Sequence, residues 1–326
     1  MEHASCCVCG SSDARAYVRT WDRSHGLPGE FTFLKCRGCG HVYLSPRPDQ
    51  AEIGRYYPET YKEYVMGTEK PGAFVRINRR YGLAKRCRVI TRRRRPGRLL
   101  DVGCGVGVLM DAMRRRGWEV QGVDVTPSAV RIARARFGLD VIEGALEEAG
   151  FPDERFDAVT LWNVIEHVPD PPSTLREVAR VLRPGGLLVL ATPNVDALDA
   201  RLFRQRWALW EAPRHFNLFS PASLGALLRG SGFAGVTSES LVGTWFGLAT
   251  SLQYLWEERR GFRPVPGDGG RPYWDTRLPL QALRAVALPY TWLADRLGAG
   301  SAMVVCADRV ETPVRAPPPA FLARSL

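Results

Sequence analysis

The middle of the chain alternates short apolar runs with longer segments of mixed polarity, starting at Arg98. Apolar runs of this length are typical of buried strands, and the segments between them are predicted to be helical. Apolar strands that alternate with helices indicate a parallel sheet covered on both faces, so this region is predicted to be an α/β domain. The predicted strands are 98–102, 119–124, 140–143, 156–162 and 187–192, and the predicted helices are one that ends at Arg116, 127–137 and 173–182.

Beyond the fifth strand the pattern is less regular. The segment 220–229 opens with Ser-Pro and predicts a helix, because Ser is a preferred N-cap and Pro suits the first helical position. Two closing strands are predicted over 236–242 and 302–307. The segment 245–297 between them is rich in aromatic residues and proline, and we interpret it as a helical insertion that forms a lid or substrate-binding cap. Its aromatic residues could equally form the core of a capping subdomain.

The rest of the chain divides at changes of composition. Residues 1–48 are rich in cysteine and end in Ser-Pro-Arg-Pro, which breaks regular structure and marks a module boundary. Residues 49–96 are rich in Tyr and Arg and are predicted to form a helical linker, which Pro96-Gly97 ends. The main domain is then expected over 97–310, followed by a disordered tail over 311–326.

Size and composition are those of an ordinary globular protein. The chain has 326 residues, 45% of them hydrophobic and 24% charged, which suits one large domain with a small one attached. It contains no uncharged apolar run of about 18 residues or more, so neither a transmembrane helix nor stable membrane association is expected. The N-terminal sequence lacks a basic region followed by an apolar stretch, which argues against a secretory signal and favours the cytoplasm.

The chain is basic, with 45 Lys+Arg against 34 Asp+Glu and a formal net charge of +11. An excess of this size is compatible with an anionic partner. Much of it lies in one Arg-rich run of the linker, over residues 76–95. A nucleic acid, an acidic substrate or a solvated helix face would each account for such a run.

Two Cys-x-x-Cys-Gly sequences lie near the N-terminus, over residues 6–10 and 36–40. In a reducing cytosol, paired cysteines favour a metal site over a disulfide framework. Four thiolates in a tetrahedral arrangement suit structural zinc, and they leave no position for catalysis. The predicted ligands are Cys6, Cys9, Cys36 and Cys39, with Cys7 as an alternative for one of them and His41 as a less favoured substitute. Free thiols in a small β-hairpin are the alternative interpretation.

A glycine-rich turn follows the first strand of the main domain. It contains Gly103, Gly105 and Gly107, and glycine lets the backbone turn sharply and approach a ligand closely. The spacing departs from the dinucleotide fingerprint, whose third glycine would fall on Val108. Asp124 ends the next strand, where its carboxylate can accept hydrogen bonds from two vicinal ribose hydroxyls. Taken alone, Asp124 could also cap the helix that follows.

Four motifs in this order resemble the class I S-adenosylmethionine-dependent methyltransferases over residues 97–310. They are LLDVGCGVG, VQGVDVTPSAV, FDAVTLWNVIEHVPDP and LREVARVLRPGGLLVLATPN. The resemblance implies a Rossmann-like seven-stranded sheet whose last strand is antiparallel, with the cofactor over the carboxyl ends of the strands. The N-terminal module, in turn, resembles the zinc ribbons that precede many bacterial methyltransferase domains.

The resemblance also implies which residues bind S-adenosylmethionine. Those at its methionine and sugar end would be Asp101, Gly103, Gly105 and Gly107. Asp124 would hold the ribose hydroxyls, and Asn163 would face both cofactor and substrate. Family members often carry an acidic residue near the adenine, where this chain has Gly-Ala-Leu ending at Leu146, so a backbone amide there and Glu147 are expected to replace it.

A hydroxyl or amine acceptor would also need a base. We take His215 as the leading candidate, because it follows the fifth strand and similar methyltransferases often place a histidine before a helix that opens with Phe-Ser. A helix-entry residue that bonds the backbone is the alternative. His167 follows Glu166, in a pair that shapes the loop beneath the cofactor in most relatives. In ubiquinone-type O-methyltransferases a similar Glu-x-x-Glu-His segment holds a divalent metal, and this chain has Asn163 at its first position.

These features together predict an enzyme that transfers a methyl group from S-adenosylmethionine to a small molecule. We favour an oxygen acceptor in a bacterial secondary-metabolite or cell-surface sugar pathway. An RNA methyltransferase that binds RNA through the ribbon and the Arg-rich helix is the second hypothesis. Against it, the ribbon is not notably basic and no Asn/Asp-Pro-Pro-Tyr/Phe motif follows the fourth strand. A non-catalytic cofactor-binding scaffold is the third.

Overall fold

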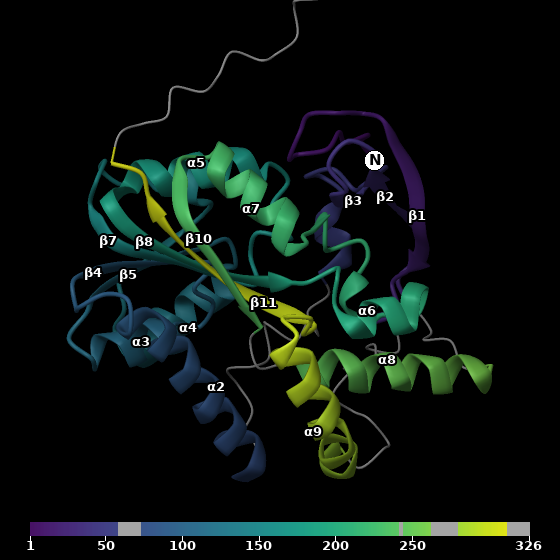
Figure 1. The fold of residues 1–326 in the computed structure, drawn as a ribbon. Helices are drawn as coiled ribbons and strands as arrows, with labels where there is room; N and C mark the ends of the chain where they lie inside the picture. The colour runs from purple at the N-terminus through teal and green to yellow at the C-terminus, as the bar shows by residue number, and fades with distance from the viewer. Residues whose placement is uncertain (58–72, 241–243, 262–279, 312–326) are drawn as a thin grey trace, which may run out of the picture.

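The structure is a computed structural model that describes residues 1–57, 73–240, 244–261 and 280–311 (Figure 1). Its strands form two sheets, a central sheet of seven strands and an N-terminal sheet of four. Helices cover both faces of the central sheet, and the four-stranded sheet lies beside one end of it. Among the described residues, none of the helices combines the length and the apolar character needed to span a bilayer.

The central sheet has the strand order β10-β11-β8-β7-β4-β5-β6. Neighbouring strands from β6 to β8 are parallel, whereas β11 is antiparallel to both β8 and β10. The predicted α/β fold with an antiparallel last strand is therefore confirmed. The strands are β4 (Arg98–Val102), β5 (Glu119–Asp124), β6 (Val141–Glu143), β7 (Phe156–Trp162), β8 (Leu182–Pro193), β10 (Phe233–Ser240) and β11 (Ala302–Arg309).

The two faces of this sheet carry separate cores, because successive residues of a strand point to opposite faces. Leu100 of β4 belongs to the core beneath α5 and α7, whereas Leu99 belongs to the core beneath α2 and α3. Figure 1 shows the same division, with α4 on the side of α3. The helices are α2 (Ala73–Thr91), α3 (Val108–Arg114), α4 (Pro127–Phe137), α5 (Pro171–Val181) and α7 (Pro221–Gly230). Helices on both faces explain why the central strands are mostly apolar.

Two of these helices begin at side-chain caps. The hydroxyl oxygen of Ser220 accepts a hydrogen bond from the Ser223 N–H at 3.1 Å, as the sequence predicted for the start of α7. The carboxylate of Asp170 accepts the Ser173 N–H at 3.1 Å, so α5 begins at Pro171, earlier than predicted. Proline in the first turn suits both helices because no intrahelical partner is needed for its nitrogen.

The small sheet joins the N-terminal segment to the main body of the chain. Its order is β1-β2-β3-β9, and its last strand lies in sequence between β8 and α7. Antiparallel pairing places Val42 opposite Leu218 and Tyr43 opposite Asn217. The strands are β1 (Ala14–Trp21), β2 (Glu30–Cys36), β3 (Val42–Leu44) and β9 (Asn217–Leu218). The predicted module boundary at residue 48 is thus crossed by a strand pairing.

A single hydrophobic core lies beneath this small sheet. It combines Phe33 and Leu44 from the N-terminal strands with Trp207 and Phe216 from the segment after β8, and with Leu248 from α8. Each of these side chains is less than 10% exposed. The N-terminal residues therefore do not bury their apolar surface alone, because their core is completed by residues more than 150 positions later in the chain.

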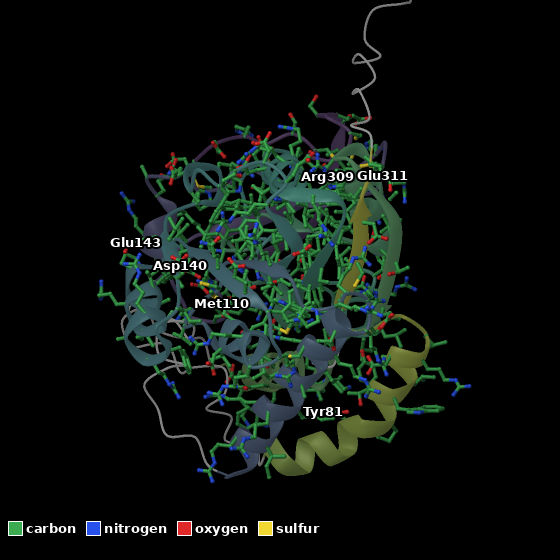
Figure 2. The ribbon with its side chains drawn as sticks, turned by 90° about the vertical axis from the view of Figure 1, so that its left-hand side faces the viewer. Tyr81, Met110, Asp140, Glu143, Arg309 and Glu311 are labelled. Carbon is green, nitrogen blue, oxygen red and sulfur yellow. The ribbon has the colours of Figure 1, made fainter. Side chains whose placement is uncertain are left out.

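The basic linker is described in two pieces, η1 (Ile53–Tyr56) and α2, and residues 58–72 lie outside the described part. Cys87 and Ile90 anchor α2 on the sheet, whereas Tyr81 lies toward its outer end (Figure 2). Within the Arg-rich run, Arg93 pairs with Glu239 at 2.9 Å and Arg94 with Asp308 at 2.5 Å. These two cations are therefore neutralised within the fold.

The predicted lid contains two described helices, and residues 262–279 between them lie outside the described part, as do 312–326 of the predicted tail. The helices α8 and α9 pack on each other, and α8 also packs on α6 and η4. Leu248 and Ala287 contribute to the shared core, so part of the insertion is structural. The elements are α6 (Leu198–Phe203), η3 (Arg204–Arg206), η4 (Ala208–Trp210), α8 (Thr244–Arg259) and α9 (Leu280–Arg296). Whether the insertion also acts as a lid stays a prediction.

Candidate functional site

The predicted glycine turn joins β4 to α3. Gly103, Gly105 and Gly107 have φ values of +66°, +54° and +79°, a region that side chains other than glycine disfavour. A Cβ on Gly103 would lie 2.4 Å from Val164 Cγ2, and one on Gly107 would lie 2.3 Å from Leu139 Cδ1. A Cβ on Gly105 would meet nothing within 4 Å. Two glycines thus permit close packing, whereas the middle one faces open space where a ligand can approach the backbone.

Asp124 at the end of β5 is hydrogen-bonded to this turn. Its Oδ2 accepts the Gly105 N–H at 2.7 Å, and its Oδ1 accepts the Thr126 N–H at 2.8 Å. A carboxylate can accept about four hydrogen bonds, so each oxygen retains a lone pair beyond these two contacts. Such a pair of oxygens fits two vicinal hydroxyls. Asp124 therefore both shapes the turn and fits the ribose contact expected from the sequence.

Asp101 lies deeper, within β4. It is 3% exposed, and its Oδ1 accepts a hydrogen bond from the Thr160 hydroxyl of β7 at 2.5 Å. Burial raises the pKa of this carboxyl to about 7, although the bond from Thr160 acts in the opposite direction. Asp101 is thus placed beneath the glycine turn, where it connects two central strands.

The other two predicted cofactor residues follow neighbouring strands. Asn163 comes directly after β7, is exposed, and has φ +56°, a conformation that Asn tolerates better than most residues. Leu146 lies in η2 (Leu146–Glu148) after β6 and is 3% exposed. Beside it, Glu147 accepts the Thr174 hydroxyl at 2.5 Å. The predicted residues therefore gather at the carboxyl edge of four adjacent parallel strands, the usual position of a ligand in this type of sheet.

The two predicted histidines meet although they lie far apart in the sequence. The rings of His167 and His215 are 4.7 Å apart between centroids, at 73°. His167 Nδ1 lies 3.0 Å from the Arg214 carbonyl oxygen, and His215 Nδ1 lies 2.8 Å from the Leu209 carbonyl oxygen. A carbonyl can only accept, so both contacts favour a protonated Nδ1 that donates. His167 Nδ1 also lies 3.2 Å from the Tyr57 hydroxyl, which can donate or accept. With Nδ1 protonated, the lone pair of each neutral ring lies on Nε2.

Carboxylates surround this pair. His215 Nε2 is 3.6 Å from Glu211 Oε2, and the nearest ligand-type atoms of Glu166, His167 and His215 all lie within 4.8 Å of one another. Glu166 is 1% exposed and accepts the Thr192 hydroxyl at 3.0 Å. Such a group could hold a metal ion, and it contains the Glu166 and His167 of the metal-binding pattern in the sequence. With Glu211 beside His215, the arrangement also fits a base with an adjacent carboxylate.

The ligands expected for zinc also come together. The Sγ atoms of Cys6, Cys9, Cys36 and Cys39 lie within 4.8 Å of one another. The two halves have matching backbones: the Gly10 N–H donates to the Cys6 carbonyl at 2.8 Å, and the Gly40 N–H donates to the Cys36 carbonyl at 3.1 Å. Both glycines have φ +75°. Four convergent soft ligands on two equivalent turns fit a tetrahedral zinc ion.

Cys7 and His41, the alternative ligands, lie apart from this cluster. The Cys7 thiol donates to Asn217 Oδ1 at 3.3 Å and lies 3.3 Å from His41 Nε2. Asn217 belongs to β9, so these side chains connect the N-terminal sheet to the segment that carries His215. The structure therefore favours the four ligands that the sequence ranked first.

Three further residues at this site, Asp22, Glu211 and Arg214, were not identified from the sequence. The Arg214 side chain is 0% exposed and pairs with Asp22, which is also 0% exposed, through Nη2 and Oδ1 at 2.7 Å. Glu211 approaches both Arg214 and His215. A charged residue in isolation is usually solvated, and only the fold shows that these are buried together.

Comparison with known proteins agrees with this geometry. A family model described as a methyltransferase domain matches residues 75–238. The ubiquinone biosynthesis O-methyltransferase of Alkalilimnicola ehrlichii is 45% identical over 103 residues, which cover 30% of this chain and 42% of that protein. The protein of the same name from Xanthomonas oryzae pv. oryzae is 43% identical over 149 residues, 40% of this chain and 60% of that protein. The chain thus spans about half the length of these curated relatives.

One solved structure supports the same architecture, and a second is similar over much of the chain. The [4+2]-cyclase SpnF aligns with a TM-score of 0.52 and 19% identity, over 82% of this chain and 99% of that one. A SAM-dependent methyltransferase from Thermotoga maritima aligns with a TM-score of 0.49 and 18% identity, over 79% of this chain and 98% of that one. Identity this low establishes architecture only, because one fold carries many activities.

The lowered pKa of His167 predicts that the free energy of unfolding depends on pH. Burial and the neighbouring His215 lower the pKa of His167 to about 3, whereas an unfolded histidine has a pKa near 6.5. Between these values only the unfolded chain binds the proton, so stability falls as the pH falls below about 6.5, by up to about 1.4 kcal/mol per pH unit. We expect His167→Gln to remove this contribution. Urea unfolding at pH 7 and pH 5 should show a smaller loss in the variant, and equal losses would contradict the prediction.

Proposed function

The chain belongs to the class I S-adenosylmethionine-dependent methyltransferases, and from this premise we propose that it transfers a methyl group from S-adenosylmethionine to an oxygen nucleophile of a small molecule. The main support is the contact between Asp124 and Gly105. It joins the ends of β4 and β5 and presents carboxylate oxygens beside an open stretch of backbone. A non-catalytic scaffold would not require the histidine pair on the acceptor side, in which His215 is buried.

The cofactor supplies an activated methyl group on its sulfonium, so the protein has only to bind, orient and deprotonate. We propose that Gly103, Gly105 and Gly107 allow the backbone to contact the cofactor, above the carboxyl of Asp101. Asp124 would bind the ribose hydroxyls. Asn163 and Leu146, on the loops after β7 and β6, would border the methyl and adenine ends.

We propose His215 as the base on the acceptor side. Its Nδ1–H is bonded to the Leu209 carbonyl, so its Nε2 can take a proton from the acceptor. Glu211 Oε2, at 3.6 Å, would stabilise the resulting imidazolium. His167 stays neutral at physiological pH and supports the ring of His215 at its face. These roles specify the acceptor only as a small molecule with an oxygen nucleophile.

A phenolic hydroxyl is the acceptor that suits this base. A phenol has a pKa near 10, far below that of an alkyl alcohol, so a neutral histidine can deprotonate a phenol more readily. The curated relatives are named as O-methyltransferases of ubiquinone biosynthesis, which agrees with an oxygen acceptor. The secondary-metabolite or sugar pathway expected from the sequence finds no support in these names. RNA methylation is not favoured either, because Arg93 and Arg94 are paired within the fold.

We also propose that the four-cysteine cluster holds one structural zinc ion. Backbone N–H groups of each turn approach the sulfur atoms, as in a closed thiolate site. The cluster lies in the sheet that continues into β9. Zinc would therefore stabilise the sheet that borders the acceptor side, without taking part in the reaction.

Asp124→Ala should abolish cofactor binding. Loss of hydrogen bonds to a charged group costs about 1.5–3 kcal/mol each, so the Kd for S-adenosylmethionine is expected to rise by about 100-fold or more. Titration calorimetry on the folded variant measures this directly. Asp140→Ala is the matched control, because Asp140 is exposed at the opposite end of β6 and should leave the Kd unchanged. Equal affinities for wild type and Asp124→Ala would contradict the assignment of the cofactor site.

The zinc content of two variants should show that Cys36 is a ligand and that Cys7 is not. We expect about one zinc per chain in the wild type and in Cys7→Ser, and a clear loss in Cys36→Ser, because three thiolates hold zinc less tightly than four. Emission spectrometry on protein purified without chelator gives the ratio. Zinc loss in Cys7→Ser with retention in Cys36→Ser would show that the ligands are wrongly assigned.

Removal of the base should affect turnover and spare cofactor binding. With catechol as the acceptor, His215→Ala is expected to lower kcat by about 100- to 10,000-fold. The Kd for S-adenosylmethionine should stay within about threefold, because His215 lies on the acceptor side. His3→Ala, at an exposed histidine near the N-terminus, serves as the control. Near-normal turnover by His215→Ala would leave only a structural role for this residue.

A further inference from the structure

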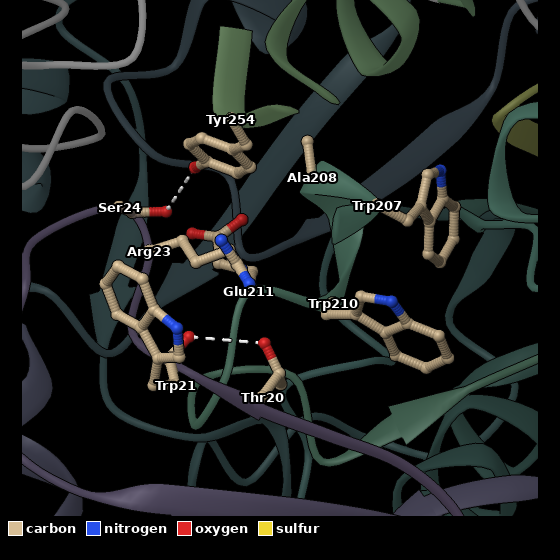
Figure 3. A pocket seen from close by; sticks show the side chains of 9 residues that line it. All are labelled: Thr20, Trp21, Arg23, Ser24, Trp207, Ala208, Trp210, Glu211 and Tyr254. Atoms are coloured by element: carbon tan, nitrogen blue, oxygen red, sulfur yellow. Dashed lines mark hydrogen bonds between the residues drawn. The ribbon is translucent and has the colours of Figure 1, made fainter. Parts of the chain in front are cut away.

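The loop between β1 and β2 reaches the acceptor side of the proposed site. Figure 3 shows its residues Arg23 and Ser24, and Trp21 at the end of β1, around a narrow space that Glu211 and Tyr254 also line. The Ser24 hydroxyl lies 3.4 Å from the Tyr254 hydroxyl, and Arg23 Nη1 lies 3.6 Å from Glu258 Oε2. These contacts hold the two residues after Asp22 against α8.

Asp22 and Arg214 form a fully buried two-pronged ion pair. Arg214 Nη2 donates to Asp22 Oδ1 at 2.7 Å, and Nη1 donates to Oδ2 at 3.1 Å. Both side chains are 0% exposed. Asp22 Oδ1 also accepts the backbone N–H groups of Ser24 and His25, at 3.2 and 3.1 Å. Two parallel charge-assisted bonds hold a guanidinium in one orientation as well as in one place.

The backbone of Arg214 is connected to both histidines. Its carbonyl oxygen accepts the Nδ1–H of His167 at 3.0 Å, and His215 is the next residue in the chain. Its side chain is held from a third direction by the Tyr56 carbonyl at 2.9 Å. A shift of the guanidinium would therefore move the peptide that fixes His167 and carries His215.

Glu211 connects the ion pair to the proposed base. One of its oxygens is 3.4 Å from Arg214 Nε, and the other is 3.6 Å from His215 Nε2. Because Asp22 neutralises Arg214, the Glu211 carboxylate can remain near His215. Without the charge of Asp22, the buried guanidinium would attract Glu211 more strongly and draw it away from the imidazole.

We propose that Asp22, in the loop between β1 and β2 of the N-terminal sheet, is a positioning residue that acts through Arg214 to hold His167 and His215 in their Nδ1–H forms and to orient them toward the acceptor. This inference rests on the proposed function for its effect on turnover, but its effect on the histidines requires neither cofactor nor acceptor. The N-terminal sheet thereby contributes to the site from outside the cofactor-binding domain.

Side-chain nitrogen NMR of the zinc-loaded full chain tests this inference, because the chain has only five histidines. In the wild type we expect His167 and His215 as neutral Nδ1–H tautomers, assigned by single substitutions. Asp22→Asn keeps an oxygen for the two loop amides and removes the charge. It should shift the tautomer ratio of His167 by about fivefold or more, which corresponds to the net free energy of one hydrogen bond. An Nε2–H form of His167 in the wild type would overturn the proposal directly.

Asp13→Asn is the matched control, since it removes a carboxylate of the same small sheet region that is 72% exposed and pairs with Arg37 at 3.3 Å. It should leave the histidine spectrum unchanged. Turnover of catechol by Asp22→Asn should fall by about 10- to 100-fold, with the affinity for S-adenosylmethionine within about twofold of wild type. Wild-type tautomers and wild-type turnover in Asp22→Asn would refute the positioning role.

If Asp22→Asn does not fold, the double variant Asp22→Asn/Arg214→Gln removes both charges of the buried pair and carries the same expectation. Unchanged tautomers in the folded double variant would also overturn the proposal. A wild-type protein that binds no S-adenosylmethionine would instead contradict the proposed function. The NMR result on the ion pair would stand independently of that outcome.

Discussion

The hydrogen bond from the Gly105 N–H to the Asp124 carboxylate joins the ends of two parallel strands, and the cofactor side of the molecule is organised around it. The bond requires a backbone with positive φ at Gly105, and that turn in turn requires the packing of Gly103 on Val164. A Cβ at Gly103 would clash with Val164, and one at Gly105 would be strained at φ +54°. The loops after β4, β5 and β7 are therefore fixed together by the backbone geometry of the glycines and by the side chains of Asp124 and Val164.

The acceptor side is organised differently, by contacts between distant parts of the chain. The pairing of β3 with β9 and the shared core around Trp207 bring the N-terminal sheet against the segment that carries His215. The four-cysteine cluster includes Cys36, the last residue of β2 in the same sheet. The N-terminal region is thus better understood as one wall of the acceptor side than as an appended module.

The sequence predicted the cofactor side well because its signals are local. The strands from 98 to 162, the glycine turn and the position of Asp124 follow from apolar runs and from glycine spacing within about thirty residues. The cysteine ligands were also correctly grouped, because paired spacing carries its own geometry. By contrast, Asp22 and Arg214 are 192 positions apart, and each alone is typical of a solvated surface. No local pattern indicates that two such residues are buried against each other.

The contribution of the buried ion pair to the stability of the fold does not explain why the pair is present. Removing two charges from water costs several kcal/mol, and an apolar pair of similar size often holds a fold as well or better. What an apolar pair cannot provide is direction: two parallel bonds fix the plane of the Arg214 guanidinium, and its peptide carbonyl then selects one tautomer of His167. An interaction that adds little to stability but sets the orientation of two adjacent imidazoles is best explained by a requirement of the site they form.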